Sequence, residues 1–174
     1  MFATKSLALA VCIAAAAAPT AAQADILRFH VALDGKYGSD PSGAPGTGEA
    51  RVLIDTATHK VSVDLDVTGI TIDDLSDNLT QSPVGPIHFH KYATAAGGDS
   101  VLALPLPFGP DYQSTSGGLR VALKDEDYDA GAALVKSTLS FEDFLAGMKA
   151  GLIVLNIHTD RFEAGEISGL VVPG

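Results

Sequence analysis

Three of the five histidines in this chain lie in two short segments whose spacing favours a shared metal site. His88 and His90 form a His-x-His pair, and side chains along a β-strand alternate between its two faces, so both imidazoles would leave the strand on one side. His158 ends a second apolar run, residues 152–157. If these two strands are neighbours, three imidazoles converge. Imidazole nitrogen is a ligand for copper, zinc, nickel and iron.

The sequence leaves two interpretations of these histidines open. In the first, they bind one metal ion through three nitrogens and leave a coordination position for water or a small ligand such as superoxide. Copper is favoured because it heads the affinity order for nitrogen sites, and zinc is next. In the second, the histidines only satisfy hydrogen bonds to loop carbonyls, and the protein is a structural or adhesive module without a metal.

Three further polar residues lie close to these segments in the sequence. Glu166 and Asn156 are candidates to support an imidazole, because a metal-bound histidine donates its other N–H to an oxygen acceptor. Glu166 could equally accept backbone N–H groups where its strand begins. Arg161 could steer a small anion toward a metal, or pair with a carboxylate in its own loop. The remaining histidines, His30 and His59, are expected at the surface.

The N-terminal segment has the features of an export signal. Lys5 supplies a positive charge, residues 7–18 are apolar, and Ala22-Gln23-Ala24 matches a small-residue cleavage site. We therefore expect residues 1–24 to be a cleaved signal peptide, with the mature chain starting near Asp25 and located in the periplasm or outside the cell. The mature part, residues 25–174, is long enough for one domain with a sizeable core.

Charge and composition restrict the partners and ligands of the mature chain. The formal charge is −10 and becomes −11 when Lys5 is removed, which opposes binding to nucleic acid and to anionic membrane surfaces. No second apolar stretch is long enough for membrane insertion. The single cysteine, Cys12, lies in the expected signal peptide, so a metal in the mature chain must be held by nitrogen and oxygen. The oligomeric state is left open.

Short alternating apolar runs separated by Gly, Pro, Asp and Ser predict an all-β fold. The clearest pair is 50–55 with 61–67, joined by a turn at 56–60. The other expected strands are 27–33, 86–91, 100–106, 119–123, 152–159 and 166–172. So many short strands indicate an antiparallel, Greek-key-like β-sandwich or barrel.

One short helix is expected at about 141–149. Ser140 is a capping residue with Asp143 three positions later, and Gly151 lies just beyond the end. A weaker helix or turn is expected at 71–79.

Several motifs together resemble the CHRD (chordin-type) domain family. They are Leu33-Asp34-Gly35, Gly46-Thr47-Gly48-Glu49-Ala50, Ile87-His88-Phe89-His90, Leu155-Asn156-Ile157-His158-Thr159 and Gly165-Glu166-Ile167-Ser168-Gly169. The resemblance covers nearly all of residues 25–174 and implies a β-sandwich with little defined chemistry. Departures from the family pattern fall in the loops 36–45, 91–98 and 160–164, which bear on specificity more than on fold.

A looser similarity is to the copper site of copper–zinc superoxide dismutases, which take copper ligands from an early-strand His-x-His and a late-strand histidine. His88, His90 and His158 are similar to that trio. The bridging histidine, the separate zinc cluster and the structural disulfide of those enzymes have no counterpart in this sequence. The similarity implies a possible copper-dependent, superoxide-handling enzyme as an alternative to a non-catalytic metal-binding module.

Overall fold

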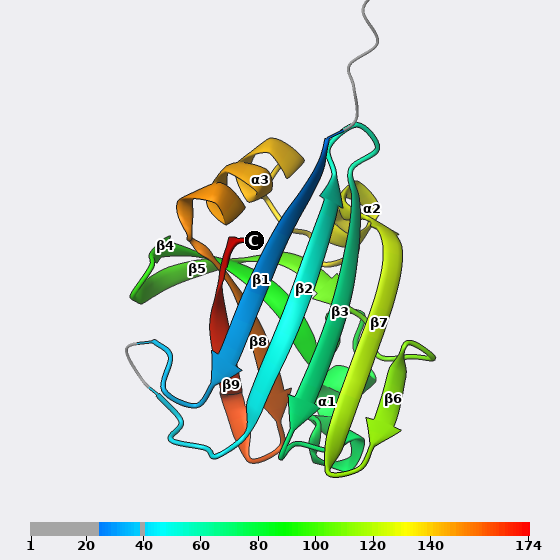
Figure 1. Ribbon diagram of the computed structural model, residues 1–174, viewed down its shortest axis with the longest axis vertical. Coiled ribbons are helices and arrows are strands. Elements are labelled where there is room, and N and C mark those ends of the chain that lie inside the picture. The colour runs from blue at the N-terminus through cyan, green and yellow to red at the C-terminus, as the bar shows by residue number, and fades with distance from the viewer. Residues whose placement is uncertain (1–24, 39–40) are drawn as a thin grey trace, which may run out of the picture.

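The computed structural model describes residues 25–38 and 41–174, so the expected signal peptide lies outside the described residues. Figure 1 shows long strands crossing the molecule, with short helices at its ends. The described strands form a nine-stranded antiparallel sheet in the order β5-β4-β8-β9-β1-β2-β3-β7-β6. The all-β, antiparallel prediction is therefore confirmed.

The strands are β1 (Ile26–Asp34), β2 (Thr47–Asp55), β3 (Lys60–Thr68), β4 (Ile87–Thr94), β5 (Gly97–Leu106), β6 (Tyr112–Thr115), β7 (Gly118–Asp127), β8 (Ile153–Thr159) and β9 (Phe162–Pro173). Each predicted strand is present, with its ends shifted by up to a few residues. The short edge strand β6 was not predicted. The helices are the 3-10 turn η1 (Ile72–Asp74), α1 (Asp77–Thr80), α2 (Tyr128–Leu134) and α3 (Phe141–Ala150).

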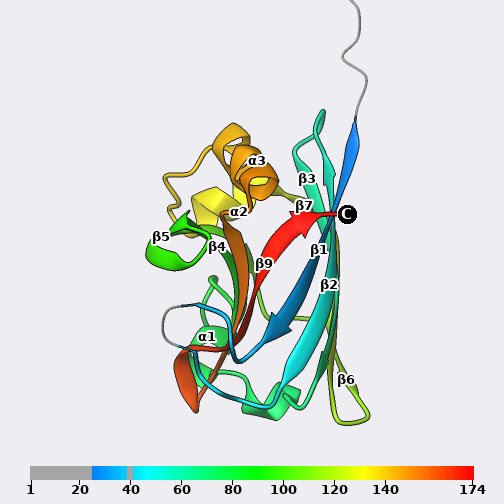
Figure 2. The same ribbon diagram turned by 60° about the vertical axis from the view of Figure 1, so that its left-hand side comes forward.

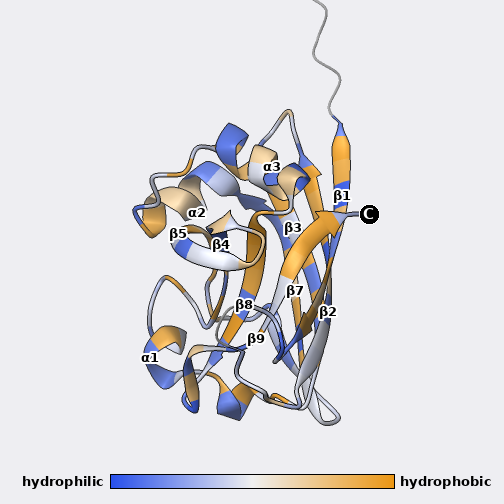
Figure 3. Cartoon of the chain, turned by 90° about the vertical axis from the view of Figure 1, so that its left-hand side faces the viewer, coloured by the Kyte–Doolittle hydropathy of each residue, from blue (hydrophilic) through white to orange (hydrophobic). Residues whose placement is uncertain are grey.

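The sheet curls so that its two halves face each other across the core. Figure 2 shows β1, β2, β3 and β7 on one side, with β4, β5 and β8 opposite them. Side chains of alternating strand positions, such as Val31, Val52 and Val63, are almost completely buried between the halves. The hydropathy colouring in Figure 3 places most hydrophobic residues on the strands and more hydrophilic ones on turns and helices. This pattern is expected because each strand buries one face and leaves the other toward solvent.

Strand β8 departs from this alternation, because all seven of its residues are buried. Its inner face carries Leu155 and Ile157, while Asn156 and His158 belong to the outer face and are only 3% and 7% exposed. The orange of β8 in Figure 3 is interrupted by blue. Polar groups buried in this way require hydrogen-bond partners or another ligand. The outer face of β8 is therefore where the fold buries polar groups that need a partner.

Helix α3 confirms the predicted helix at 141–149. The Ser140 hydroxyl accepts a hydrogen bond from the Asp143 backbone N–H at 3.1 Å, and Gly151 follows the helix with φ of 64°. Such a left-handed residue ends helices because glycine adopts it without steric penalty. Helix α2 was not predicted; its Tyr128 ring stacks on Phe144 of α3 with centroids 4.7 Å apart. The element η1 falls within the expected helix or turn at 71–79, and α1 overlaps it and ends one residue later, at Thr80.

No helix among the described residues is long and apolar enough to cross a membrane.

Candidate metal centre

The register of two neighbouring strands brings the predicted histidines together. β4 and β8 pair antiparallel, with His88 directly opposite Asn156 and His90 opposite Val154. His158 lies two residues beyond Asn156, on the same outer face, and is therefore a diagonal neighbour of His88. The backbone N–H of His158 donates to the Pro86 carbonyl at 2.8 Å, which continues the strand pairing to the level of the third histidine.

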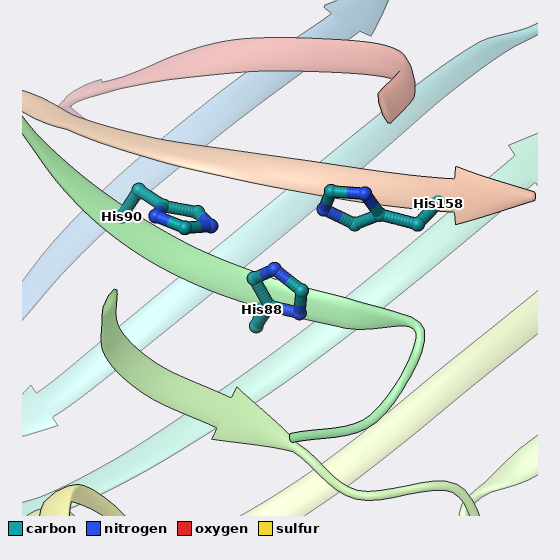
Figure 4. A group of neighbouring side chains, drawn as sticks. All are labelled: His88, His90 and His158. Carbon is teal, nitrogen blue, oxygen red and sulfur yellow. The ribbon is translucent and has the colours of Figure 1, made fainter. Parts of the chain in front are cut away.

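The three rings form a compact group on the outer face of the sheet. The ring centroid of His88 lies 4.4 Å from that of His158 and 4.8 Å from that of His90. Each residue offers one ring nitrogen such that the three nitrogens all lie within 4.8 Å of one another. Figure 4 shows the rings turned toward a common space from β4 and β8. Two nitrogens bound to one ion lie at most about 4.2 Å apart, so small ring rotations would close the group on a metal.

Two backbone carbonyls, one in the loop before β4 and one at the start of β9, orient two of the rings. The Nδ1–H of His88 donates to the Gly85 carbonyl at 3.0 Å, and that of His158 donates to the Glu163 carbonyl at 2.8 Å. A carbonyl can only accept, so Nδ1 carries the hydrogen in both rings and Nε2 keeps its lone pair. Gly85 has φ of 71°, and a Cβ there would lie 2.1 Å from the Leu106 carbonyl oxygen, so the turn holding the first carbonyl requires glycine.

These bonds match part of the interpretation without a metal, but they leave nitrogens unsatisfied. His90 Nδ1 and His158 Nε2 are buried and have no hydrogen-bond partner among residues 25–38 and 41–174. Buried polar atoms in proteins are nearly always satisfied, so these two nitrogens are available to a ligand in the cluster. A transition metal fits both, and the carbonyl bonds to Nδ1 of His88 and His158 are the kind that orients metal-bound imidazole.

The environment keeps the rings neutral at physiological pH. Burial, together with the neighbouring His158 and His90 rings, lowers the pKa of His88 to about 3. Burial and His158 lower the pKa of His90 to about 4, and burial also lowers the pKa of His158 against the opposing bond to Glu163. Placing a positive charge beside two other rings in a buried site is unfavourable. The lone pairs are therefore free to bind a cation.

The other predicted site residues lie around this cluster. Asn156 is buried, its Nδ2 lies 3.4 Å from the Tyr92 hydroxyl, and its Oδ1 has no partner in the part of the chain that the structure describes. Glu166 accepts a hydrogen bond from the Thr159 hydroxyl at 2.7 Å. Arg161 is exposed, and its guanidinium lies 5.2 Å from the centre of the Phe162 ring. His30 is exposed on β1 and is not one of the clustered ligands.

A polar pocket of about 140 Å³ adjoins the histidine cluster. Its lining includes Asp34, Tyr37, Tyr92, Asn156, Glu166 and Ser168. Sequence reasoning missed the pocket and singled out Asn156 and Glu166 only. The strand pairings place Asp34 opposite Ser168, Ser168 opposite Asn156, and Asn156 opposite His88. Each of these residues sits at an outward position of its strand, but the order of the strands was needed to align them.

The family model of the CHRD domain matches residues 29–171. The chain belongs to the CHRD domain family. No curated protein and no solved structure matches it. The matched range includes both histidine segments and the pocket beside them, so the candidate metal centre lies inside the CHRD domain rather than in an appended segment.

Proposed function

We propose that this CHRD protein is an exported module that binds one transition metal ion through His88, His90 and His158. The observation that carries the proposal is the pair of buried, unpartnered nitrogens in a cluster of three neutral imidazoles. No described side chain or backbone group compensates those nitrogens for lost hydration. A bound ion would satisfy them together.

Copper is the preferred ion and zinc the alternative. The ligands are three nitrogens with no thiolate among them, and copper(II) binds such sites more tightly than the other divalent first-row metals. Three protein ligands also leave a coordination position for water or a small molecule. When bound, copper would supply a redox-active centre, whereas zinc would supply only a Lewis acid.

Metal analysis of protein purified after export tests the proposal. Wild-type protein is expected to contain about one equivalent of metal, and His88→Ala and His158→Ala are expected to lose it. His30→Ala is the matched control because its ring is exposed on β1, away from the cluster. Circular dichroism establishes that each variant is folded. Equal metal content in the wild type and both cluster variants would eliminate the shared site and favour a structural or adhesive module.

Two further measurements address the finer parts of the proposal. Copper and zinc offered in competition to the metal-free protein identify the preferred ion. N-terminal sequencing of the exported protein is expected to start at Asp25, and retention of residues 1–24 would contradict export by cleavage.

A superoxide-handling enzyme is the second candidate, because three imidazoles leave an open position for that anion. A superoxide-consumption assay of the copper-loaded protein is decisive for this alternative. Activity no greater than that of free copper would reject it.

A further inference from the structure

The polar pocket beside the histidines is enclosed by segments that are far apart in the sequence. The Tyr37 hydroxyl, in the loop after β1, donates to the Ala95 carbonyl in the β4–β5 turn at 2.8 Å. The Ser42 hydroxyl donates to the Glu166 carbonyl of β9. These two bonds fix Tyr37 and Ser42 beside the outer face of β8 and β9, where both residues line the pocket. The pocket is thus a defined part of the fold.

The pocket and the metal centre share a wall. Asn156, which lines the pocket, is directly opposite His88 in the strand pairing. Tyr92 also lines it, and its ring centre lies 6.0 Å from that of His90. A Cβ on Gly165, a third lining residue, would lie 3.9 Å from His158 Cε1. Each imidazole therefore has a neighbour that belongs to the pocket.

The lining selects for positive charge. Asp34 and Glu166 are its charged residues, and none of the described residues that line it is lysine or arginine. Carboxylate, hydroxyl and amide oxygens are ligands or hydrogen-bond acceptors for a hydrated cation. The volume of about 140 Å³ has room for about four water-sized groups. A hydrated ion that has lost part of its water shell fits this space.

Asn156 supplies an observation independent of the carboxylates. Its side chain is 3% exposed, its Oδ1 has no partner, and its only hydrogen bond among the described residues, to Tyr92, is long at 3.4 Å. A buried amide oxygen without a donor is unfavourable unless another group compensates it. Its position between the pocket and His88 allows that oxygen to contact a cation passing from one to the other.

We infer that the pocket is an outer loading site, where Asp34, Glu166 and Asn156 capture a divalent cation and deliver it to the three histidines. This inference rests on the proposed metal-binding function and adds the route of entry. The same carboxylates repel anions, so superoxide gains no electrostatic attraction along this path. The loading site therefore favours a metal-binding module over a superoxide-handling enzyme.

The rate of metal uptake tests the loading site. Copper(II) is mixed with the metal-free protein in a stopped-flow instrument, and tyrosine fluorescence reports binding because the chain contains no tryptophan. Asp34→Asn keeps the oxygen that accepts the Lys36 N–H at 2.8 Å and removes only the charge. At low salt this variant is expected to bind copper about three to five times more slowly, with the difference shrinking as salt increases. The dissociation rate and the stoichiometry should remain those of the wild type.

The matched control is Asp111→Asn, which removes one negative charge just before β6, at a residue that does not line the pocket. Its uptake rate is expected to stay close to that of the wild type. If Asp34→Asn fails to fold, Glu166→Gln gives a second removal of pocket charge with the same expected slowing. Unchanged uptake rates in the folded pocket variants, or equal slowing in Asp111→Asn, would overturn the loading site while metal binding stands. A wild type that binds no copper would overturn both.

Discussion

Metal-free protein should lose stability steeply as the pH falls below 6.5, because protonation of the clustered histidines is resisted only in the folded state. The pKa of His88 is lowered from 6.5 to about 3, and that of His90 to about 4. Between these values and 6.5 the unfolded chain binds more protons than the folded chain. The free energy of unfolding therefore rises with pH over this range. The stability contributed by the two neutral rings is complete above pH 6.5 and is lost as the pH falls toward their folded-state pKa values.

The magnitude follows from the window in which the unfolded histidines are charged and the folded ones are not. A pH of 5 is still above both folded-state pKa values. Each ring therefore lowers the free energy of unfolding by about 1.36 kcal/mol for every pH unit below 6.5. This amounts to about 2 kcal/mol per ring, or about 4 kcal/mol for the two. The loss is a large fraction of the 5–15 kcal/mol that stabilises an ordinary domain. His158 acts in the same direction because burial lowers its pKa as well.

Urea unfolding in EDTA, followed by circular dichroism between pH 5 and 7.5, measures this dependence. The wild-type slope between pH 5 and 6 is expected to be about 2.7 kcal/mol per pH unit, the value for two protons. Replacing both His88 and His90 by Gln should remove most of the slope, whatever the stability of the variant at neutral pH. His30→Gln, at an exposed position, should retain it. A wild-type slope below that of a single proton, about 1.4 kcal/mol per pH unit, would refute buried neutral rings.

Three other outcomes are expected. Copper at about 100 times its dissociation constant should stabilise the wild type by about 2.7 kcal/mol and raise its Tm by several degrees. EDTA should reverse this shift in Tm, and His158→Ala should show no shift. Gly85→Ala should destabilise the protein in urea unfolding and weaken metal binding in a calorimetric titration, because the new Cβ meets the Leu106 carbonyl and displaces the acceptor of the His88 N–H. Ser140→Ala should lower the free energy of unfolding in urea by about 1 kcal/mol because it removes the α3 cap, and the metal content should stay unchanged. Loss of metal in this variant would contradict the separation of helix and site.

The candidate site combines residues from one short segment with residues far away in the sequence, and these measurements separate their effects. The rings of His88 and His90 come from one strand, whereas the third ring depends on β8 and on the Glu163 carbonyl near the start of β9. Variants in the turns should therefore alter ring orientation without removing any ligand. Variants in the pocket should lower the rate of metal uptake without changing the metal stoichiometry of the final complex.

The amino-acid sequence by itself determined the elements and the faces on which their side chains lie. Alternating apolar residues predicted the strands, and the Ser140 cap with Gly151 predicted α3, because strand period and helix ends depend on neighbouring residues. The His88–His90 spacing likewise placed two imidazoles on one face. Helix α2 was missed because its stability comes from contacts such as the stacking of Tyr128 on Phe144, which no local pattern contains.

Only the tertiary structure decided that β4 lies beside β8 and in which register. That pairing joins segments far apart in the chain, and a shift of one residue would have turned His158 toward the core. Packing of the folded chain buried the rings on the outer face, which lowered the histidine pKa values, and brought Asp34 and Tyr92 together at the pocket. Burial and neighbouring strands are properties of the whole packed chain, so spacing along the sequence could propose the ligands but could not assemble their environment.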